Sequence, residues 1–414
     1  MPSSTSPSEP GAPLRRETLF ATACAGIFVF GIAYALLGAL FGLPEMRERL
    51  HIDLAQQGDL LLVLFAGIFL ATVVVGPLID RFGNQPVLII ASLLVGAALG
   101  GFVVARSFLT SAAAALLLGF GGGGLNTSSN VLVSQLYGER RGSRLNVLGI
   151  FFGFGALFIP LLAASISALL SVDQLLMIAA SLAGVCAVSY VALRFPPAGE
   201  AQSFSWREAA GVIRMPGVLL FGLLLFCESG DEASIGGWVS TYIGRAGSSA
   251  HVATWILAGY WAALMLGRML AARLLARVDK HRLVLMGGIG GVVGAALLLA
   301  APSVAAMAVA TALIGLSYAP IYPTTLAMAG DRYPRFAGTV FGALFSIALV
   351  GGGGFPWTVG QVSQSAGMRY AMLLPVAGAV AISLLSLRLA RGGASVAPGS
   401  SVGRPVEDAS RLEL

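Results

Sequence analysis

The chain has 414 residues, of which 57% are hydrophobic and 11% charged, and its mean hydropathy is +0.86. That much apolar surface is more than one globular core can remove from water, which excludes a water-soluble domain. The apolar runs are about 20 residues or longer, the length of helix that crosses a bilayer about 30 Å thick. Strands of a membrane barrel would instead alternate over about ten residues. We therefore predict an all-α membrane protein.

Twelve apolar runs follow one another in two groups of six, which predicts transmembrane helices near residues 18–42, 58–79, 87–105, 109–136, 146–170, 173–193, 216–243, 250–275, 283–300, 303–329, 336–362 and 368–387. The longest polar break separates the sixth run from the seventh, where a linker between two halves is expected. The predicted organisation is a disordered N-terminus (1–17), a first six-helix half (18–193), a cytoplasmic linker (194–215), a second six-helix half (216–390) and a disordered tail (391–414).

Basic residues gather in every second loop. If twelve spans alternate, most arginines and lysines lie on the side that also holds both chain ends. The positive-inside rule makes that side, with both termini, cytoplasmic. The formal net charge of +6 therefore reflects topology, and no aromatic-rich basic patch indicates binding of nucleic acid. We expect a monomer in the bacterial inner membrane, with the lipid bilayer and a small-molecule substrate as its partners.

The sequence offers little for metal, disulfide or covalent chemistry. Cys24, Cys186 and Cys227 lie in separate apolar runs without CxxC spacing, and the three histidines are far apart. The glycine runs at 119–125 and 350–355 lack the strand and the GK[ST] of a phosphate loop, so they favour close approach of helices. HExxH does not occur, and no G-x-S-x-G is found within the apolar runs. We predict that the protein is not an enzyme and has no cofactor or metal site.

A short motif, GPLIDRFGNQP (76–86), lies in the loop between the second and third runs. It resembles the signature of the major facilitator superfamily, whose gating positions are held here by Gly76, Asp80, Arg81 and Gly83. Asn84 and Gln85 replace the usual basic pair, and the matching loop of the second half (272–282) lacks the acid. The resemblance implies two six-helix halves that rock about a central site. Gly76 is expected to let two helices touch, and Asp80 to pair on the cytoplasmic face and favour an outward-facing arrangement.

Within that superfamily, residues 119–160, 232–243 and 315–329 are similar to the fucose–proton symporter and sodium-dependent glucose transporter-like group. This resemblance implies transport of a monosaccharide by alternating access. It also implies a coupling carboxylate in the fourth span, but Asn126 occupies that position. Because an amide binds hydroxyl groups without carrying a proton, we expect substrate contact there and no proton coupling.

Three acids, Glu228, Asp231 and Glu232, lie within one turn of the seventh run. Glu228 follows the start of the run by about ten residues, or roughly 15 Å of helix, which places it near the bilayer midplane. The spacing puts all three acids on one helical face. A carboxylate at that depth costs at least ~2.5 kcal/mol, so we expect the acids to face a pathway and to couple transport to an ion. The ion is a labile proton or a sodium ion, and local unwinding could assist at Gly230, Gly236 and Gly237.

Simpler interpretations of these charges stay open. The three acids could form a wet helix end, or pair with Arg245 or Arg268. Arg268 is itself expected to snorkel toward the membrane interface. Asp59, at the start of the second run, is expected to be an N-cap.

Polar and aromatic residues at mid-depth are candidates for contact with a polyhydroxy solute. Aromatic rings cover the apolar faces of sugars, while amides and hydroxyls meet their hydroxyl groups. The candidates are Tyr34, Asn126, Asn130, Asn146, Trp238, Tyr260, Trp261, Tyr318, Tyr322, Thr324, Thr325 and Trp357. Asn126 and Asn130 form the best pair, since a spacing of four residues places both amides on one helical face. For every candidate, packing between helices is the alternative.

These features predict a secondary active transporter that moves a small neutral polyhydroxy solute, driven by a proton or sodium gradient. The alternative is a proton-driven exporter of cationic or amphiphilic compounds, in which the same acids would bind the cation.

Overall fold

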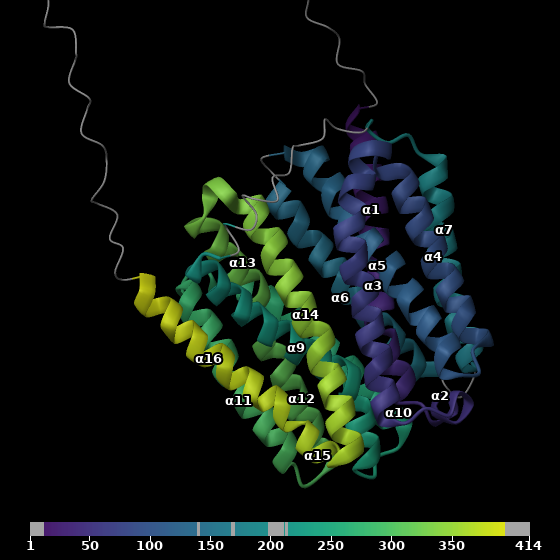
Figure 1. Ribbon diagram of the computed structural model, residues 1–414, viewed down its shortest axis with the longest axis vertical. Helices are drawn as coiled ribbons and strands as arrows, with labels where there is room; N and C mark the ends of the chain where they lie inside the picture. Colours follow the sequence, from purple (N-terminus) through teal and green to yellow (C-terminus); the bar gives the residue numbers. More distant parts are fainter. Residues whose placement is uncertain (1–11, 139–140, 167–169, 198–210, 212–213, 394–414) are drawn as a thin grey trace, which may run out of the picture.

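The computed structural model describes residues 12–138, 141–166, 170–197, 211 and 214–393. These residues form helices and no strand, which confirms the predicted all-α membrane fold (Figure 1). Eleven segments of the described chain have the length and composition to cross a membrane, and two of them, Val304–Arg332 and Met368–Arg391, are each divided between two helices. A twelfth, α9 (Pro216–Arg245), has the length but carries the three acids at its centre.

The helices of the first half begin earlier than the sequence pattern indicated. They are α1 (Ala12–Phe41), the short α2 (Pro44–Leu50), α3 (Leu54–Phe82), α4 (Asn84–Val104), α5 (Phe108–Tyr137), α6 (Arg141–Ile166) and α7 (Val172–Ala192). Residues 12–17, predicted to be disordered, are therefore helical. The remainder of the predicted N-terminal segment, 1–11, lies outside the described residues, as does most of the linker 194–215.

The second half continues with helices after the linker. They are α9, α10 (Ala250–Leu274), α11 (Lys280–Ala300), α12 (Val304–Tyr318), α13 (Ile321–Arg332), the 3-10 turn η2 (Pro334–Phe336), α14 (Ala337–Ser365), the short α15 (Met368–Ala371) and α16 (Leu373–Gly393). Residues 391–393 are thus helical too, and the rest of the predicted tail lies outside the described residues.

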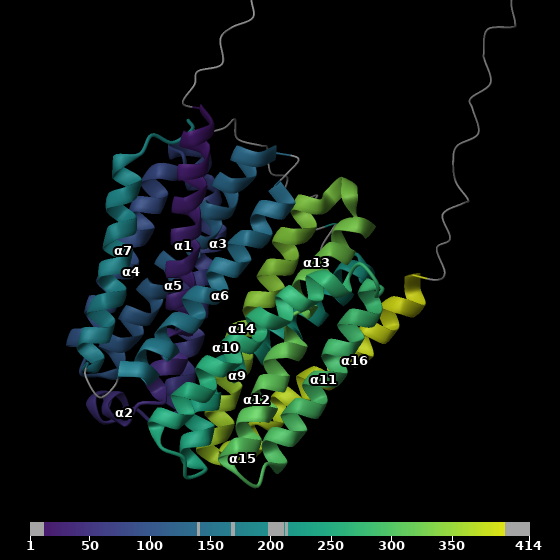
Figure 2. The same ribbon diagram turned by 180° about the vertical axis from the view of Figure 1, so that it is seen from behind.

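The two faces of the bundle differ in how their helices begin. One face, called here the terminal face, holds the start of α1 and the end of α16, and the opposite loop face holds α2 and α15 (Figures 1 and 2). Five helices start at the loop face with a side-chain N-cap, supplied by Asp53, Ser107, Ser171, Ser249 and Ser303. Each cap satisfies amide groups that would otherwise lack partners at the helix start.

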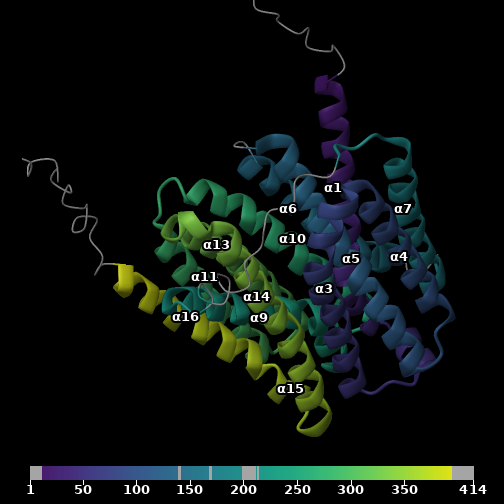
Figure 3. The same cartoon turned by 45° about the horizontal axis from the view of Figure 1, so that its top comes forward.

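The two halves meet through three helix pairs, α1 with α9, α3 with α14 and α6 with α10. The first two pairs cross near the loop face, where glycines bring the backbones together. A Cβ on Gly38 would lie 2.0 Å from the carbonyl oxygen of Gly236, and a Cβ on Gly360 would lie 2.8 Å from Cα of Gly58. Toward the terminal face the ribbons of the two halves diverge, as Figures 1, 2 and 3 all show.

The predicted tenth span, 303–329, is not one continuous helix. It is broken at Ala319–Pro320 into α12 and α13, because Pro320 has no amide hydrogen to continue the helical bonding pattern. The local unwinding expected in α9 does not occur, because the helix continues through Gly230, Gly236 and Gly237. The glycines of α9 allow close packing instead. A Cβ on Gly230, for example, would lie only 2.5 Å from the ring of Phe355.

The α1–α9 crossing gives the first testable prediction. Replacing Gly38 with alanine should push α1 from α9 and lower the stability of the purified protein by about 1–3 kcal/mol, the usual cost of overpacking. Thermal unfolding in detergent measures the change. Gly184→Ala is the matched control, since nothing lies within 4 Å of a Cβ at Gly184. Equal midpoints for the two variants would show that the backbones do not meet at Gly38.

Candidate functional site: charged residues between the two halves

The three acids of α9 are buried within the helix bundle. Their exposed fractions are 1% for Glu228, 0% for Asp231 and 7% for Glu232. Helix α9 packs against α1, α10, α12, α13, α14 and α16, so protein surrounds it at the depth of the acids. The acids therefore do not form a wet helix end.

Glu232 has a cationic partner on the neighbouring helix. The guanidinium of Arg268, on α10, lies 3.6 Å from a carboxylate oxygen of Glu232 and 5.8 Å from the ring centre of Phe152, on α6. The expectation that Arg268 snorkels toward the membrane interface is therefore wrong. The Nε atom of Arg268 is buried and has no hydrogen-bond partner among the described residues. A charge pair thus sits between α9 and α10, next to a ring of the first half.

Glu228 lies one turn before Glu232 and shares its electrostatic surroundings. Arg268 attracts it and Glu232 repels it, so two carboxylates share one guanidinium. Tyr34 from α1 and Tyr322 from α13 lie within range of both acids. One carboxylate oxygen of Glu228 is buried without a hydrogen-bond partner in the described part of the chain. This group is available to a ligand hydroxyl or amine.

Asp231 has different hydrogen-bond and packing partners from Glu228 and Glu232. The hydroxyl of Tyr318, the last residue of α12, donates to its Oδ2 at 3.2 Å. On its other side it packs against α16, where a Cβ on Gly378 would lie 2.1 Å from Oδ1. Asp231 therefore points into the second half, whereas Glu228 and Glu232 lie toward the first.

Aromatic rings from both halves surround the Glu228–Glu232 side of α9. Tyr34 is the link between them, with ring centres 5.3 Å from Phe65, 5.3 Å from Phe152 and 6.0 Å from Trp261, all in edge-on geometry. The Nε1 of Trp261 is buried and has no hydrogen-bond partner among the residues described. Phe65 and Phe152 complete this cluster, although the sequence pattern did not single them out.

Several predicted substrate residues lie with this cluster or next to it. Tyr34 and Tyr322 interact with Glu228 and Glu232, and Tyr260 donates to the main-chain oxygen of Glu232 at 3.3 Å. Trp261 contacts the ring of Tyr34. The set that the structure brings together around the acids is Tyr34, Tyr260, Trp261, Tyr318 and Tyr322. Thr324 and Thr325 follow on α13, with buried hydroxyls that have no partner among the described residues.

Other predicted substrate residues have structural contacts elsewhere. Trp238 donates to the main-chain oxygen of Pro356 at 2.9 Å and fixes α9 against α14. Asn126 and Asn130 bind each other on α5, with the Asn130 amide 3.0 Å from Oδ1 of Asn126. Asn146, on α6, is exposed. Among the described residues, none of these four forms a hydrogen bond or ion pair with the acids of α9 or with Arg268.

A set of hydrogen bonds, called here the loop-face latch, joins the halves at the end of the bundle opposite the termini. Asp59 on α3 accepts from Trp357 Nε1 at 2.9 Å and from Gln361 Nε2 at 3.0 Å, both on α14. The amide of Leu54 donates to Gln364 at 3.3 Å. The helix cap predicted for Asp59 is wrong, since Asp53 caps α3. The side chain of Trp357, predicted to contact substrate, serves this latch.

The predicted gating motif lies at the terminal face, and within the described part of the chain no hydrogen bond or ion pair joins it to the second half. Asp80 and Arg81 are exposed, and among the described residues Asp80 forms no ion pair. A Cβ on Gly76 would meet no atom within 4 Å, so the helix contact predicted for Gly76 is not made in this arrangement. Gly83 ends α3 with a positive φ of 80° and donates its amide to Ile79. In this arrangement the motif therefore makes neither the helix contact expected at Gly76 nor, among the described residues, the ion pair expected at Asp80.

The two residues that depart from the family pattern anchor this loop within the first half. Asn84 donates to Gln135 at 2.8 Å and accepts from Ser128 at 3.2 Å. Gln85 donates at 2.9 Å to the main-chain oxygens of Tyr190 and Leu193. Side-chain amides thus hold the loop against α5 and the end of α7.

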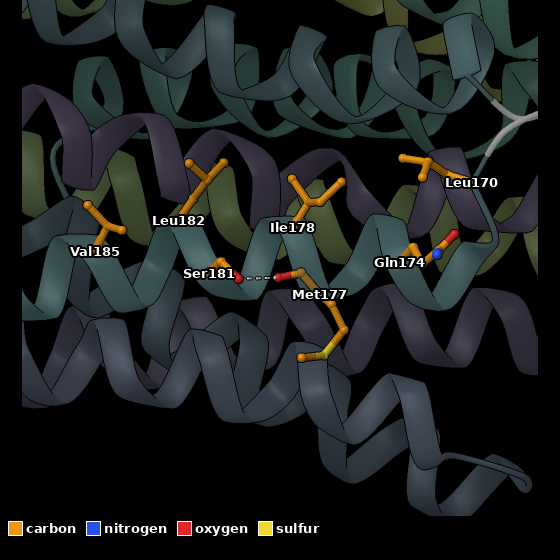
Figure 4. Close-up of a pocket in the computed structure, with 7 residues that line it drawn as sticks. All are labelled: Leu170, Gln174, Met177, Ile178, Ser181, Leu182 and Val185. Atoms are coloured by element: carbon orange, nitrogen blue, oxygen red, sulfur yellow. Dashed lines mark hydrogen bonds between the residues drawn. The ribbon is translucent and has the colours of Figure 1, made fainter.

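A pocket of about 510 Å³ on the first half lies apart from these residues. Leu170 and residues of α7 line it, among them Gln174, Met177 and Ser181, and Figure 4 shows them along one helix. Met177 and Val185 are 51% and 66% exposed, so the pocket is a groove on the outer surface of the bundle. None of the predicted site residues lines it. Within the described ranges, no group of three or more His, Cys, Asp or Glu side chains could hold a metal ion.

The sequence profile of the Major Facilitator Superfamily matches residues 23–247 and 221–409. The chain belongs to this superfamily of membrane transporters, as its motif and two sets of six spans indicated, and its relatives are transporters rather than enzymes.

Two solved structures share the fold over nearly the whole chain. The fucose:proton symporter of E. coli superposes with a TM-score of 0.63 at 19% identity, covering 91% of this chain and 99% of the symporter. The xylose transporter of E. coli, in a partially occluded inward open conformation, superposes with a TM-score of 0.73 at 12% identity, covering 91% and 98%.

Three curated relatives match parts of the chain. Organic anion transporter 3 of Sus scrofa is 35% identical over 105 residues, which are 25% of this chain and 19% of that transporter. The multi-drug resistance efflux pump PmrA of Streptococcus pneumoniae serotype 4 is 23% identical, over 63% of this chain and 67% of the pump. Sodium-dependent glucose transporter 1 of Rattus norvegicus is 27% identical, over 34% and 28%. The last match and the fucose symporter confirm the resemblance drawn from sequence motifs.

The latch predicts a conformational effect. Asp59→Ala removes both bonds to α14, and hydrogen bonds to a charged group are worth about 1.5–3 kcal/mol when buried and less at a half-exposed site. We expect the loop-face ends of α3 and α14 to separate in part of the population. Distances between spin labels at Gln56 and Ser365 measure this. Glu45→Ala, at an exposed position of α2, is the control. Identical distance distributions for both variants would contradict the role of the latch.

The Arg268–Glu232 pair predicts coupled effects on stability. Arg268→Gln leaves Glu232 buried without its cation and should destabilise the protein by about 1–3 kcal/mol. This is less than the cost of breaking a fully buried ion pair, because water reaches part of the Arg268 side chain. Adding Glu232→Gln should recover part of that loss. A double-mutant cycle of thermal unfolding measures the coupling. Strictly additive effects of the two substitutions would show that the side chains do not interact.

Proposed function

We propose that the protein is a secondary active transporter that moves a small neutral polyhydroxy solute, a monosaccharide, by alternating access. Transport is coupled to a proton or sodium gradient through Glu228, Asp231 and Glu232. The substrate binds between the halves, against the aromatic cluster around Tyr34. No cofactor beyond the coupling ion takes part.

The observation that carries this proposal is the set of unpaired polar atoms near the Glu232–Arg268 pair. Arg268 Nε and Trp261 Nε1 are donors, Glu228 Oε1 is an acceptor, and all three are buried without a hydrogen-bond partner among the described residues. A hydroxyl group both donates and accepts, so a polyhydroxy solute can satisfy both kinds of atom. The rings of Tyr34 and Trp261 can cover its apolar face. The similarity to a fucose:proton symporter and to a sodium-dependent glucose transporter supports the same class of substrate.

A second candidate is export of a cationic or amphiphilic compound. Two carboxylates, Glu228 and Glu232, share one guanidinium, which leaves an excess of negative charge when both are ionised. Aromatic faces next to such charge favour organic cations. The similarity to the efflux pump of S. pneumoniae supports this alternative.

The orientation of the protein is also proposed. The excess of basic residues places the terminal face in the cytoplasm of a bacterial cell, with the protein acting as a monomer in the inner membrane. In that orientation the loop-face latch closes the outer side, and the two halves diverge on the cytoplasmic side. This is the arrangement of an inward-facing transporter.

The proposal predicts gradient-driven uptake of a sugar by proteoliposomes. Labelled D-glucose, L-fucose, D-xylose and tetraphenylphosphonium are offered, with pH and sodium gradients imposed separately. We expect one or more sugars to accumulate, and Glu228→Gln and Glu232→Gln to reduce the accumulation at least about tenfold, since each substitution removes a buried charge. Glu45→Gln makes the same chemical change at an exposed position and should transport normally.

Two results would contradict this assignment. Transport of tetraphenylphosphonium with no sugar would select the exporter. Sugar uptake that responds to the gradients equally in the wild type and both variants would remove Glu228 and Glu232 from the coupling mechanism.

A further inference from the structure

We infer that Asp231 carries the coupling proton at a site inside the second half, and that Tyr318 connects this site to the break in the tenth span. Glu228 and Glu232 then belong to the substrate side of α9. This inference rests on the proposed function, because it names the ion and divides the roles of the three acids.

The first argument is the partner set of Asp231. Its side chain is 0% exposed, and its Oδ1 has no hydrogen-bond partner among the described residues. The one ion pair made by the acids of α9 in the described structure joins Glu232 to Arg268, and Asp231 is left without a cation. A carboxylate at membrane depth without a cation is costly, whereas the neutral carboxyl is tolerated. Asp231 is therefore suited to hold a proton in this arrangement.

The second argument is the space around the carboxyl group. Tyr318 hydrogen-bonds one oxygen, and the backbone of α16 at Gly378 lies so close to the other that a Cβ would overlap it. A sodium ion requires several oxygen ligands at once, but a proton requires no space and no further ligand. The close contact with Gly378 therefore favours a proton over sodium.

The third argument is the place of Tyr318 in the chain. It is the last residue of α12, directly before the break at Ala319–Pro320, and α13 begins at Ile321. Tyr322, on the other side of the break, interacts with Glu228 and Glu232 and stacks on Phe345 at 6.2 Å. One tyrosine thus contacts Asp231 and the other faces the substrate side. A change in the charge of Asp231 acts directly on the segment that joins them.

Other ionisable groups around α9 do not take this role. Cys227 and Glu228 of α9 and Tyr318 of α12 lie within electrostatic range of Asp231. The groups of α10, Arg268 and Tyr260, act on Glu228 and Glu232, as do Tyr34 of α1 and Tyr322 of α13. Helix α14 presents the ring of Phe355 against Gly230, and α16 presents Gly378. Glu228 and Tyr318 lie within range of each other as well, but the guanidinium of Arg268 acts on Glu228 and Glu232, whereas the hydrogen bond from Tyr318 and the contact with Gly378 belong to Asp231.

Hydrogen exchange of the purified transporter, without any solute, tests the inference. Backbone exchange of residues 311–325 is followed by mass spectrometry at about pH 6 and about pH 9, and corrected for the intrinsic effect of pH. Loss of the proton leaves a charge without a cation, which should favour local opening and raise exchange in the wild type at least about threefold. Asp231→Asn keeps an acceptor for Tyr318 but cannot ionise, so its exchange should not respond to pH.

Glu228→Gln is the matched control, since it makes the same kind of change one turn away on α9. We expect this variant to keep the pH response. A response that persists in Asp231→Asn, or that Glu228→Gln abolishes, overturns the inference. If Asp231→Asn does not fold, Tyr318→Phe takes its place: loss of the response supports the inference, and a normal response overturns it.

The outcome is separable from that of the proposed function. The exchange measurement needs no substrate, so a failure of every sugar in the uptake assay does not affect it. Conversely, gradient-driven sugar uptake can stand even if the pH response persists in Asp231→Asn, and the proton would then lie elsewhere.

Discussion

The cost of placing carboxylates at membrane depth is the constraint on which this structure depends. Helix α9 carries three of them, and every residue from Gly230 to Ile243 is buried. The bundle therefore wraps α9 with helices from both halves rather than exposing it to lipid. Once α9 is central, its two sides must face different surroundings. Glu232 finds a guanidinium on α10, and Asp231 finds a tyrosine hydroxyl at the end of α12.

Glycine makes this central position possible and keeps the contact between the halves local. Where α1 crosses α9, and where α3 crosses α14, the helices approach through backbone rather than through interlocking side chains. Small residues are the usual means of close helix packing in membranes, because lipid supplies no hydrophobic force between helices. With the cross-half bonds of the latch gathered at the loop face, the halves can close there while they diverge at the other face. This is the geometry that a rocking transporter requires.

The two halves contribute different chemistry to the space between them. The second half supplies the acids, Arg268 and most of the tyrosines, whereas the first half supplies rings such as Tyr34, Phe65 and Phe152. Asn126 is bound to Asn130 within α5. The ionisable groups that could drive transport are therefore concentrated in one half. Movement of that half relative to the other would change what surrounds them.

The sequence by itself determined the membrane class, the two sets of six spans, the superfamily and the identity of the three central acids. These features depend on hydropathy and spacing along one segment, which can be read without knowledge of neighbouring helices. Only the tertiary structure decided what each acid touches. Arg268 lies 36 residues beyond Glu232 and Tyr318 lies 87 beyond Asp231, while Asp59 binds residues about 300 positions away. Such partners depend on how α3, α9, α10, α12 and α14 pack, and no local pattern records that packing.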